Sequence, residues 1–361
     1  MFDPLVDEHQ RPDFPAVTIE PVRGGKRRAV TMRDVAAVAK VDISTVSKVL
    51  NGANISVRAE TRKRIEDAVA DLDYRPNATA RGLRLARTGA LGVLVPDLGN
   101  PVYADIVRGV MHEAEARGWV TLLAELDPDH PAEVYLRLVR ERRIDGLLVA
   151  TARSRSPIVS LLSSGELPHV FINRQGDANS LSVVSDDEAG AALGTQALID
   201  AGHRRIGLIN GPADIDTARR RRAGFEKACA GAGLDPGAVV SGPYSASGGY
   251  EAAQRILGTG ADRPTAVLAA TLTMALGAMS GFRQAGLRIP EDISVLGFDD
   301  GDLARYSEPP LTVVRMPHYE MGAAAMRLLE SVIGGEAASS VMVATPPSLI
   351  ERASVASPAG G

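Results

Sequence analysis

The sequence lacks the features that mark secreted or membrane-spanning proteins. Its 361 residues include a single cysteine, Cys229, so no intramolecular disulfide can form, which is typical of a reducing compartment. No run approaches the roughly 20 apolar residues that cross a bilayer. Residues 1–30 contain no apolar stretch long enough for a signal peptide. Since 45% of the residues are apolar, the chain can bury a sizeable core. We therefore expect a soluble, cytoplasmic protein of two or three domains.

The usual signatures of enzymes are missing as well. The chain has no phosphate-binding loop, no His-Glu-x-x-His pair, no Gly-x-Ser-x-Gly and no Cys/His cluster, and its six histidines are scattered. The acidic trio at residues 186–188 opens a predicted helix, where the helix dipole accounts for it without catalysis. We therefore predict that the protein is not an enzyme and has no catalytic residue, no metal site and no cofactor.

Charge is unevenly distributed along a chain whose net charge is only −4. Residues 1–22 carry one basic and five acidic side chains, whereas residues 23–88 carry 15 basic and 7 acidic ones. Residues 89–361 carry 24 basic and 32 acidic side chains. A basic block of about one domain's size beside an acidic remainder indicates a module that binds a polyanion. The alternative is a basic surface that is only solvated. The sequence pattern inside the block decides between these two interpretations.

The basic block shows the pattern of two short helices, a tight turn between them, and a third helix. Thr31 is a candidate N-cap, and Asp34 lies in the first turn, where acids favour a helix start. The pattern breaks at residues 40–42 and resumes until residues 51–52. The third helix is predicted at residues 59–72. The apolar positions expected to point inward are Val35, Val38 and Ala39, then Val46, Val49 and Leu50, then Ile65, Ala68, Val69 and Leu72.

This order of helices is a helix-turn-helix, whose second helix enters the major groove of DNA. Residues near the start of that helix reach base edges, and Ile43, Ser44 and Lys48 would be exposed there. Thr45 and Ser47 are better placed to contact phosphates. A plain three-helix bundle is the alternative.

Four phrases of this region, in the right order, resemble the headpiece of the LacI family of bacterial transcription regulators. They are VTMRDVA from Val30, VDISTVSKVLNG from Val41, VRAETR from Val57 and LDYRPNA from Leu72. Two departures stand out: Lys40 replaces a glycine of the turn that needs φ > 0, and Lys48 stands where the two-pronged Arg is more common. By the resemblance, the expected DNA-contact residues are Thr31, Ile43, Ser44, Thr45, Ser47, Lys48, Asn51, Asn77, Ala80 and Leu83.

Residues 76–88 form a short basic hinge. Pro76 suits the first turn of a helix, but Gly82 lowers helix propensity by roughly 1 kcal/mol relative to Ala, so the segment needs a partner surface to fold. The resemblance implies that this hinge becomes helical on DNA and that Leu83 enters the minor groove as an apolar wedge. A simple tether is the alternative. Upstream, residues 1–28 have the composition of a disordered tail.

From residue 90 onward, apolar strands alternate with amphipathic helices. This alternation, with short turns marked by Gly and Pro, predicts doubly wound parallel sheets, and the length accommodates two such halves. Strands are predicted at residues 91–95, 120–123, 146–150, 169–172, 206–209, 266–269 and 294–297, and helices at residues 103–117, 187–201 and 273–285.

A binding cleft is expected where the two halves face each other, because ligands of open parallel sheets bind beyond the carboxyl ends of the strands. Simpler roles stay open for three candidates: Arg221 as surface charge, Asp299 as a turn cap and Tyr103 as helix packing. The positions just past the predicted strands are Asn100, Pro101, Tyr103, Asn173, Arg174, Asp214, Arg221, Thr271, Asp299 and Asp300.

The core also resembles the effector domain of the LacI family, which is similar to periplasmic binding proteins. The phrases are LGNPVYADI from Leu98, GHRRIGL from Gly202, RRAGF from Arg221 and ISVLGFDD from Ile293. The pocket departs from the family where Asn173 replaces an Asp and where Thr271-Leu272 replaces an Asn-Asp pair, which alters the ligand class. An arginine and a carboxylate suit a hydroxyl-rich or anionic ligand. The implied effector-binding residues are Asn100, Tyr103, Asn173, Arg221, Thr271 and Asp299.

Together these observations predict a homodimeric transcription repressor that binds pseudo-palindromic double-stranded operator DNA and no membrane. A small-molecule effector, a sugar or related polar metabolite, would bind between the core halves and control DNA affinity. Whether it induces or co-represses stays open. A sugar-binding protein for import would share the core, but it would need a signal peptide and no headpiece. Residues 355–361 show no heptad pattern for a tetramerising coil, which favours a dimer.

The predicted domain boundaries follow from these segments. The tail spans residues 1–28, the headpiece residues 29–75, the hinge residues 76–88, the core residues 89–356 and a second tail residues 357–361. Within the core, one subdomain takes residues 89–184 and 316–334, and the other takes residues 185–315 and 335–356.

Overall fold

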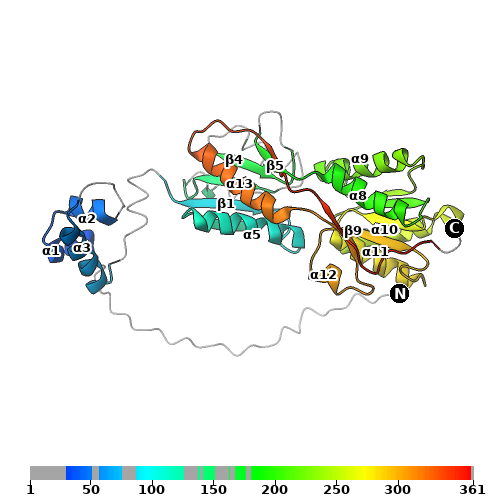
Figure 1. Cartoon of the computed structure of the whole chain (residues 1–361), viewed down its shortest axis with the longest axis horizontal. Coiled ribbons are helices and arrows are strands. Elements are labelled where there is room, and N and C mark those ends of the chain that lie inside the picture. Colours follow the sequence, from blue (N-terminus) through cyan, green and yellow to red (C-terminus); the bar gives the residue numbers. More distant parts are fainter. Residues whose placement is uncertain are drawn as a thin grey trace, which may run out of the picture. The chain divides into compact units, whose positions relative to one another are not determined.

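The structure is a computed structural model, and its described residues fall into two compact units, divided after residue 81 (Figure 1). Four predicted DNA-contact residues, the upstream tail and most of the hinge lie outside the described part of the chain. Those four residues are Asn51, Asn77, Ala80 and Leu83. The described residues are 30–50, 57–74, 87–125, 137–138, 141–150, 162, 167–175 and 180–358.

The first unit contains the three predicted helices, α1 (Met32–Ala39), α2 (Ile43–Leu50) and α3 (Ala59–Asp71). Val35, Val46 and Ile65, one from each helix, are fully buried against one another in its core. One inward position was predicted wrongly: Val38 is 53% exposed, and Ala36 is buried instead. At 100° per residue, Val35, Ala36 and Ala39 share one face of α1, and Val38 lies well away from its centre.

The start of α1 confirms the helix signal at Thr31. The backbone N–H and the hydroxyl of Thr31 both donate to Asp34 Oδ2, over 2.8 Å and 2.6 Å. These two bonds from Thr31 to the third residue of the helix fix where the helix begins.

Lys40 closes α1 in the left-handed region, at φ 52° and ψ 52°. The chain needs this conformation so that the N–H of Val41 can reach the carbonyl of Ala36 and turn towards α2. Lys40 therefore carries the steric cost of a positive φ, which a glycine at this position would not have.

Replacing Lys40 with Gly is expected to stabilise the first unit by about 1 kcal/mol, because a side chain at positive φ carries a steric cost of that order. Amide hydrogen exchange of α1 and α2 in the full chain measures the change, which should be about fivefold slower exchange. Lys40→Ala is the control, since it removes the charge and keeps the Cβ. An equal gain in both variants would show that charge, not backbone strain, is the cause.

The second unit consists of two lobes, each built on a six-stranded sheet. In the N-lobe the strand order is β11-β5-β4-β3-β1-β2, and in the C-lobe it is β12-β10-β9-β8-β6-β7. All pairs are parallel except β10 with β12. The N-lobe strands are β1 (Ala90–Val95), β2 (Val120–Glu125), β3 (Gly146–Val149), β4 (His169–Ile172), β5 (Ser182–Val184) and β11 (Val341–Met342). The C-lobe strands are β6 (Ile206–Asn210), β7 (Val239–Ser241), β8 (Ala266–Ala269), β9 (Ser294–Phe298), β10 (Thr312–Arg315) and β12 (Ser348–Ile350).

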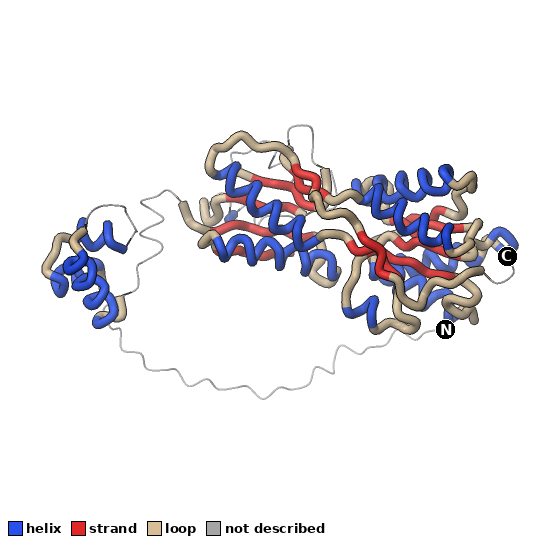
Figure 2. Tube along the Cα trace, in the orientation of Figure 1, coloured by secondary structure: helices blue, strands red, loops and turns tan. Residues whose placement is uncertain are grey.

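Helices cover these sheets, as Figure 2 shows for both lobes. In β8, Val267 and Ala269 join the apolar cluster under α10 and α11, while Ala266 and Leu268 join the cluster under α8 and α9. The C-lobe sheet is thus buried on both faces, as its nearly continuous apolar strands predict. The helices are α5 (Pro101–Ala116) and α13 (His318–Ile333) in the N-lobe, and α8 (Asp187–Asp200), α9 (Asp216–Gly231), α10 (Ala246–Leu257), α11 (Leu272–Gln284) and α12 (Asp302–Arg305) in the C-lobe.

The chain crosses between the lobes three times. It leaves the N-lobe after β5, returns between β10 and α13, and leaves again between β11 and β12. The expected boundary at residue 335 needs correction, because β11 (Val341–Met342) still pairs with β5 of the N-lobe. A strand of two residues carries too little pattern to be recognised in the sequence.

Helix pairs in the core approach so closely that their backbones touch. A Cβ on Gly109 of α5 would collide with the carbonyl of Tyr319 in α13, and one on Gly322 would collide with the carbonyl of Ile106. The same holds where Gly224 of α9 meets the carbonyl of Glu188 in α8. Each of these helix pairs is therefore closely packed along its backbones.

Candidate functional site

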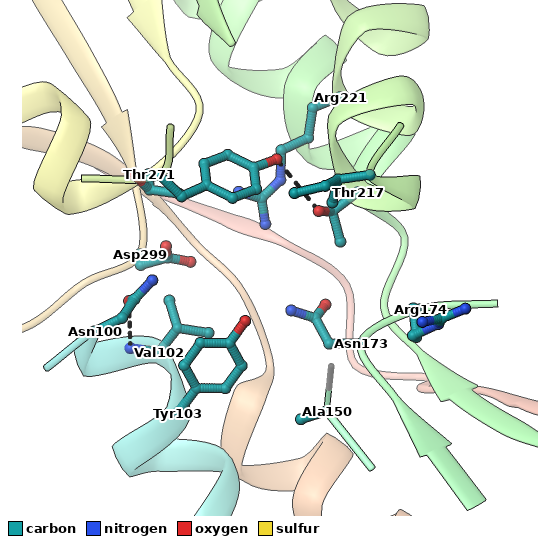
Figure 3. Close-up of a pocket in the computed structure, with 12 residues that line it drawn as sticks. Asn100, Val102, Tyr103, Ala150, Asn173, Arg174, Thr217, Arg221, Thr271 and Asp299 are labelled. Atoms are coloured by element: carbon teal, nitrogen blue, oxygen red, sulfur yellow. Dashed lines mark hydrogen bonds between the residues drawn. The ribbon is translucent and has the colours of Figure 1, made fainter. Parts of the chain in front are cut away.

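A cleft lies between the two lobes, at the carboxyl ends of their strands (Figure 3). The structure brings all six predicted effector residues into its lining. Arg174 also lines it, whereas Pro101, Asp214 and Asp300 are not among the described residues that do. The lining consists of Asn100, Val102, Tyr103, Ala150, Asn173, Arg174, Ile215, Thr217, Arg221, Tyr244, Thr271 and Asp299.

The N-lobe contributes Asn100 and Tyr103 from the start of α5, just after β1. Asn100 Oδ1 accepts a hydrogen bond from the N–H of Val102 over 3.2 Å and so caps the helix. That bond leaves the amide nitrogen of Asn100 as a donor towards the cleft. In Figure 3 the side chains of Asn100, Tyr103 and Asp299 lie close together.

Arg221 enters the cleft from α9 as a buried cation. Its Nε donates to Asp187 Oδ1 over 2.8 Å, Nη1 donates to the carbonyl of Ala270, and the guanidinium lies 4.2 Å from the ring centroid of Phe298. Burial alone would lower the pKa of Arg221, but the nearby carboxylates of Asp187 and Asp299 raise it above its usual value. Arg221 is therefore always charged, and it is not a surface residue of the arginine run.

Asp187, the partner of Arg221, is a functional residue that the sequence did not reveal. It is fully buried and also pairs with Arg220, whose Nη1 lies 2.6 Å from Asp187 Oδ2. Its neighbours in the acidic trio behave differently: Asp186 caps α8, and Glu188 forms an exposed pair with Lys227. The helix dipole therefore gives an incomplete account of the trio.

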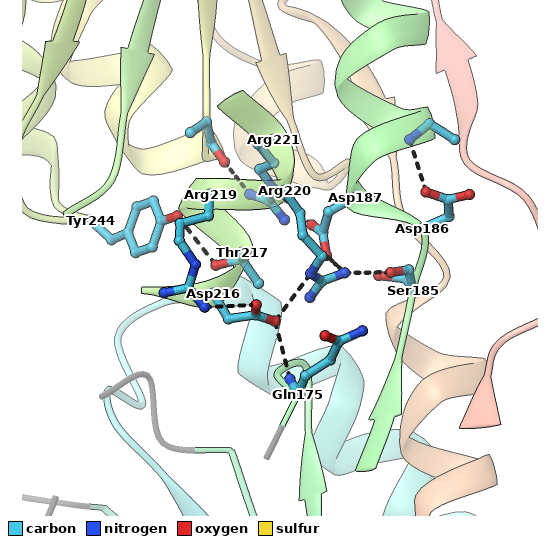
Figure 4. Close-up of polar contacts among 12 residues, drawn as sticks. Gln175, Ser185, Asp186, Asp187, Asp216, Thr217, Arg219, Arg220, Arg221 and Tyr244 are labelled. Carbon is cyan, nitrogen blue, oxygen red and sulfur yellow. Dashed lines mark hydrogen bonds and ion pairs between the residues drawn. The ribbon is translucent and has the colours of Figure 1, made fainter. Parts of the chain in front are cut away.

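Asp216 joins this network to the N-lobe (Figure 4). Its Oδ2 accepts from Arg220 Nε and from the backbone N–H of Gln175, each over 3.1 Å, and Gln175 follows β4 of the N-lobe. Arg219 Nη2 donates to the other oxygen, Oδ1, over 3.1 Å. The arginines next to Arg221 thus hold Asp216 in place, and its bond with Gln175 joins the two lobes beside the cleft.

Two acceptor oxygens in the cleft are buried without a donor among the described residues, Asp299 Oδ2 and Asn173 Oδ1. Both residues follow strands and both have positive φ, 71° for Asp299 and 60° for Asn173. Among non-glycine residues, Asn and Asp adopt this conformation most readily, and both side chains line the cleft. Because an unpaired buried acceptor is costly, these oxygens are suited to donors supplied by a ligand.

Two tyrosines complete the lining with aromatic surface and hydroxyl groups. Burial raises the pKa of Tyr103 and of Tyr244 above their usual values, so both stay neutral. The hydroxyl of Tyr244 lies 3.3 Å from Thr217 Oγ1. Neither Tyr244 nor Thr217 was predicted. Tyr244 follows β7, so the strand-end rule would have found it if this three-residue strand had been recognised.

The predicted DNA-contact residues of the first unit lie mostly on the outer face of α2. Ile43, Ser44 and Lys48 are exposed, Thr45 is partly buried, and Thr31 is exposed before α1. Ser47 is only 7% exposed, and its contact with a phosphate stays a prediction.

Comparison with known proteins finds a matching family model for each of the two units. Residues 31–77 match the model of bacterial regulatory proteins of the lacI family, and residues 195–355 match the periplasmic binding protein-like domain. The transcriptional repressor PurR of Aliivibrio fischeri strain MJ11 is 35% identical over 331 residues, which cover 90% of this chain and 98% of that protein. The chain belongs to the LacI family. It is therefore a DNA-binding transcription regulator of the repressor type with an effector-binding core.

Other members of the LacI family agree with this assignment. The ribose operon repressor of Escherichia coli strain K12 is 35% identical, over 90% of this chain and 99% of that protein. A crystal structure of the lac repressor dimer, bound to operator and the anti-inducer ONPF, has a TM-score of 0.78 and 30% identity and covers 91% of this chain and all of that chain. These relatives are transcriptional repressors rather than enzymes. No helix in the described part of the chain is long and apolar enough to cross a membrane.

Proposed function

We propose that this LacI-family protein is a cytoplasmic homodimeric repressor whose operator affinity is set by a neutral, hydroxyl-rich effector held in the cleft. The observation that carries the proposal is the pair of buried acceptors without donors, Asp299 Oδ2 and Asn173 Oδ1. A ligand that supplies hydroxyl or N–H donors would satisfy both oxygens.

The charges of the cleft favour a neutral ligand over an anion. Arg221 is already engaged by Asp187. Arg174 lies over the ring of Phe171, 5.0 Å from its centroid, and extends away from the other labelled side chains in Figure 3. A phosphate or carboxylate would find no uncommitted cation among these two arginines and would lie near the carboxylate of Asp299. A sugar or related polar metabolite fits the donors, acceptors and aromatic surface.

The DNA-binding side of the proposal rests on α2. Its exposed residues Ile43, Ser44 and Lys48 form the surface that a helix-turn-helix presents to the major groove. Two such units related by a twofold axis would read the two halves of a pseudo-palindromic operator. The basic composition of residues 23–88 supplies the phosphate contacts that make this binding salt-dependent.

The homodimer is supported by apolar side chains that the described surface leaves exposed. Val120 is 60% exposed on the edge strand β2, and Tyr306 is 77% exposed just after α12. Further exposed members of this set are Leu98, Met111, Leu122, Leu123 and Leu303. Large apolar side chains that gather on a surface mark protein interfaces, and a second copy of the chain would cover them.

The proposal predicts that neutral compounds stabilise the full chain and that their phosphorylated counterparts do not. A thermal-shift series would compare D-ribose, D-glucose, cellobiose and adenosine with ribose 5-phosphate, glucose 6-phosphate and AMP. A ligand at about 100 times its Kd adds roughly 2.7 kcal/mol of stability. Stabilisation by the phosphorylated compounds alone would overturn the proposed ligand class.

A compound that stabilises the chain should also change its affinity for DNA. Fragments selected from random double-stranded DNA by the full chain would provide the operator, and fluorescence anisotropy would measure binding with and without the compound. Coupling of this kind typically changes affinity by about 5- to 150-fold in one direction. A compound that saturates the cleft and leaves DNA affinity unchanged would overturn the regulatory role.

A further inference from the structure

His318 is a buried histidine whose side chain has one hydrogen-bond partner among the described residues, and that partner lines the cleft. Its Nε2 lies 2.7 Å from Asp299 Oδ1, and each of the two side chains is 4% exposed. The other ring nitrogen, Nδ1, has no partner among the described residues. His318 itself does not line the cleft; it lines a groove on the other side of Asp299, together with Asp105 and Arg108 of α5.

We propose that His318 is the positioning residue of Asp299, and that it links occupancy of the cleft to the N-lobe helices α13 and α5. This inference rests on the proposed function, because it concerns the same cleft. It adds a role for a residue that is not part of the lining of the cleft.

The first step of the argument is the orientation of the carboxylate. Because Asp299 Oδ1 accepts from His318, the carboxylate cannot rotate freely, and Oδ2 is the oxygen left without a donor. A hydrogen bond to an ionised acceptor is stronger than a neutral one, so the contact fixes the side chain well. A ligand hydroxyl then meets a single preorganised acceptor, which reduces the ordering cost of binding.

The second step is the location of His318 in the chain. It is the first residue of α13, immediately after the crossing from β10 of the C-lobe to the N-lobe. Asp299 follows β9 of the C-lobe. Their hydrogen bond therefore ties a ligand-facing carboxylate of the C-lobe to the end of an N-lobe helix.

The third step is the rigid contact between α13 and α5. The two helices meet backbone to backbone at Gly109 and Gly322, and Tyr319 Oη lies 3.1 Å from His112 Nδ1. Tyr103 of α5 and Asn100, which caps that helix, both line the cleft. A displacement of Asp299 that reaches α13 through His318 therefore also displaces α5, and the two sides of the cleft move together.

The test compares His318→Phe with His318→Gln in the full chain. Phe keeps a planar ring and removes the donor, whereas Gln places an N–H donor close to the position of Nε2. If the role of His318 were purely structural, the ring of Phe would preserve it. If His318 positions Asp299, the N–H donor of Gln preserves that role. The Gln variant should therefore behave as the wild type, and the Phe variant should not.

Amide hydrogen exchange provides a readout that needs no ligand. In His318→Phe, exchange at residues 321–326 of α13 and 105–110 of α5 should be about tenfold faster, the effect of losing one hydrogen bond to a charged group. His318→Gln should restore the wild-type rates. Acceleration confined to α13, or equal in both variants, would overturn the link to α5. If the Phe variant does not fold, Asp299→Leu removes the same bond and should give the same exchange pattern.

Ligand binding provides the second readout, with the probe that stabilises the wild type in the series from D-ribose to adenosine. Its Kd should rise about tenfold in His318→Phe and stay near the wild-type value in His318→Gln. An unchanged Kd in the Phe variant would overturn the positioning role. If no probe stabilises the wild type, the proposed ligand class fails, and the exchange experiment still decides the role of His318.

Discussion

Asp187→Asn should lower the free energy of unfolding by about 3–5 kcal/mol, the range measured when one partner of a buried ion pair is removed. Asp187 is fully buried, accepts a hydrogen bond from Arg221 and forms an ion pair with Arg220, and Arg221 is buried as well. The amide cannot balance the charge of Arg221, which remains desolvated in the protein interior. Urea-induced unfolding of the full chain, followed by circular dichroism, measures the loss.

Glu188→Gln is a matched control, because it makes the same chemical change at the next residue of the same helix turn. Glu188 pairs with Lys227 at the surface, and exposed pairs of this kind contribute about 0–1 kcal/mol. The control also separates two explanations of the acidic trio. If the helix dipole alone accounted for the acidic trio, both variants would lose a similar free energy of unfolding, about 0.3–1 kcal/mol.

Gly224→Ala should destabilise the core by about 1–3 kcal/mol, the usual cost of overpacking a close contact. The added Cβ would collide with the carbonyl of Glu188 and lie 3.0 Å from the Cβ of Ala191. The carbonyl of Glu188 is a backbone group of α8, so no side-chain rotation can relieve the collision. The helices α8 and α9 would therefore have to separate.

Gly231→Ala in the same helix is the matched control and should have the opposite sign. A Cβ on Gly231 would meet no atom within 4 Å. Removing glycine from a helical position restricts the unfolded chain and stabilises a protein by about 0.4–1 kcal/mol. Thermal unfolding of both variants gives the comparison. A loss of stability in both would show that the glycines serve helix geometry rather than the contact between α8 and α9.

The fold and most of the cleft could be predicted because they follow from strong local signals and one topological rule. The seven predicted strands and three predicted core helices are confirmed, with ends shifted by a few residues. Since parallel strands end at the same edge of a sheet, the residues that follow them converge. The rule brought Asn100 and Asn173 of one lobe together with Thr271 and Asp299 of the other.

The remainder could not be predicted because it depends on contacts between distant segments. Nothing in the sequence distinguishes Asp187 from Asp186 or Glu188. The pairing of Asp187 with a buried arginine 34 residues away is visible only in the structure. His318 follows a proline at the end of a crossing and carries no local signal for its bond to Asp299. Short strands such as β7 and β11 are fixed by their neighbours in the sheet rather than by their own two or three residues.

The three crossings between the lobes also set the order in which the protein can be completed during synthesis. The helices of the first unit lie within residues 32–71, so their contacts are local and form early. The N-lobe sheet, by contrast, lacks α13 and its edge strand β11 until residue 342 has left the ribosome. Since chains are made from the N-terminus, the DNA-reading unit is finished while both lobes of its sensor are still incomplete.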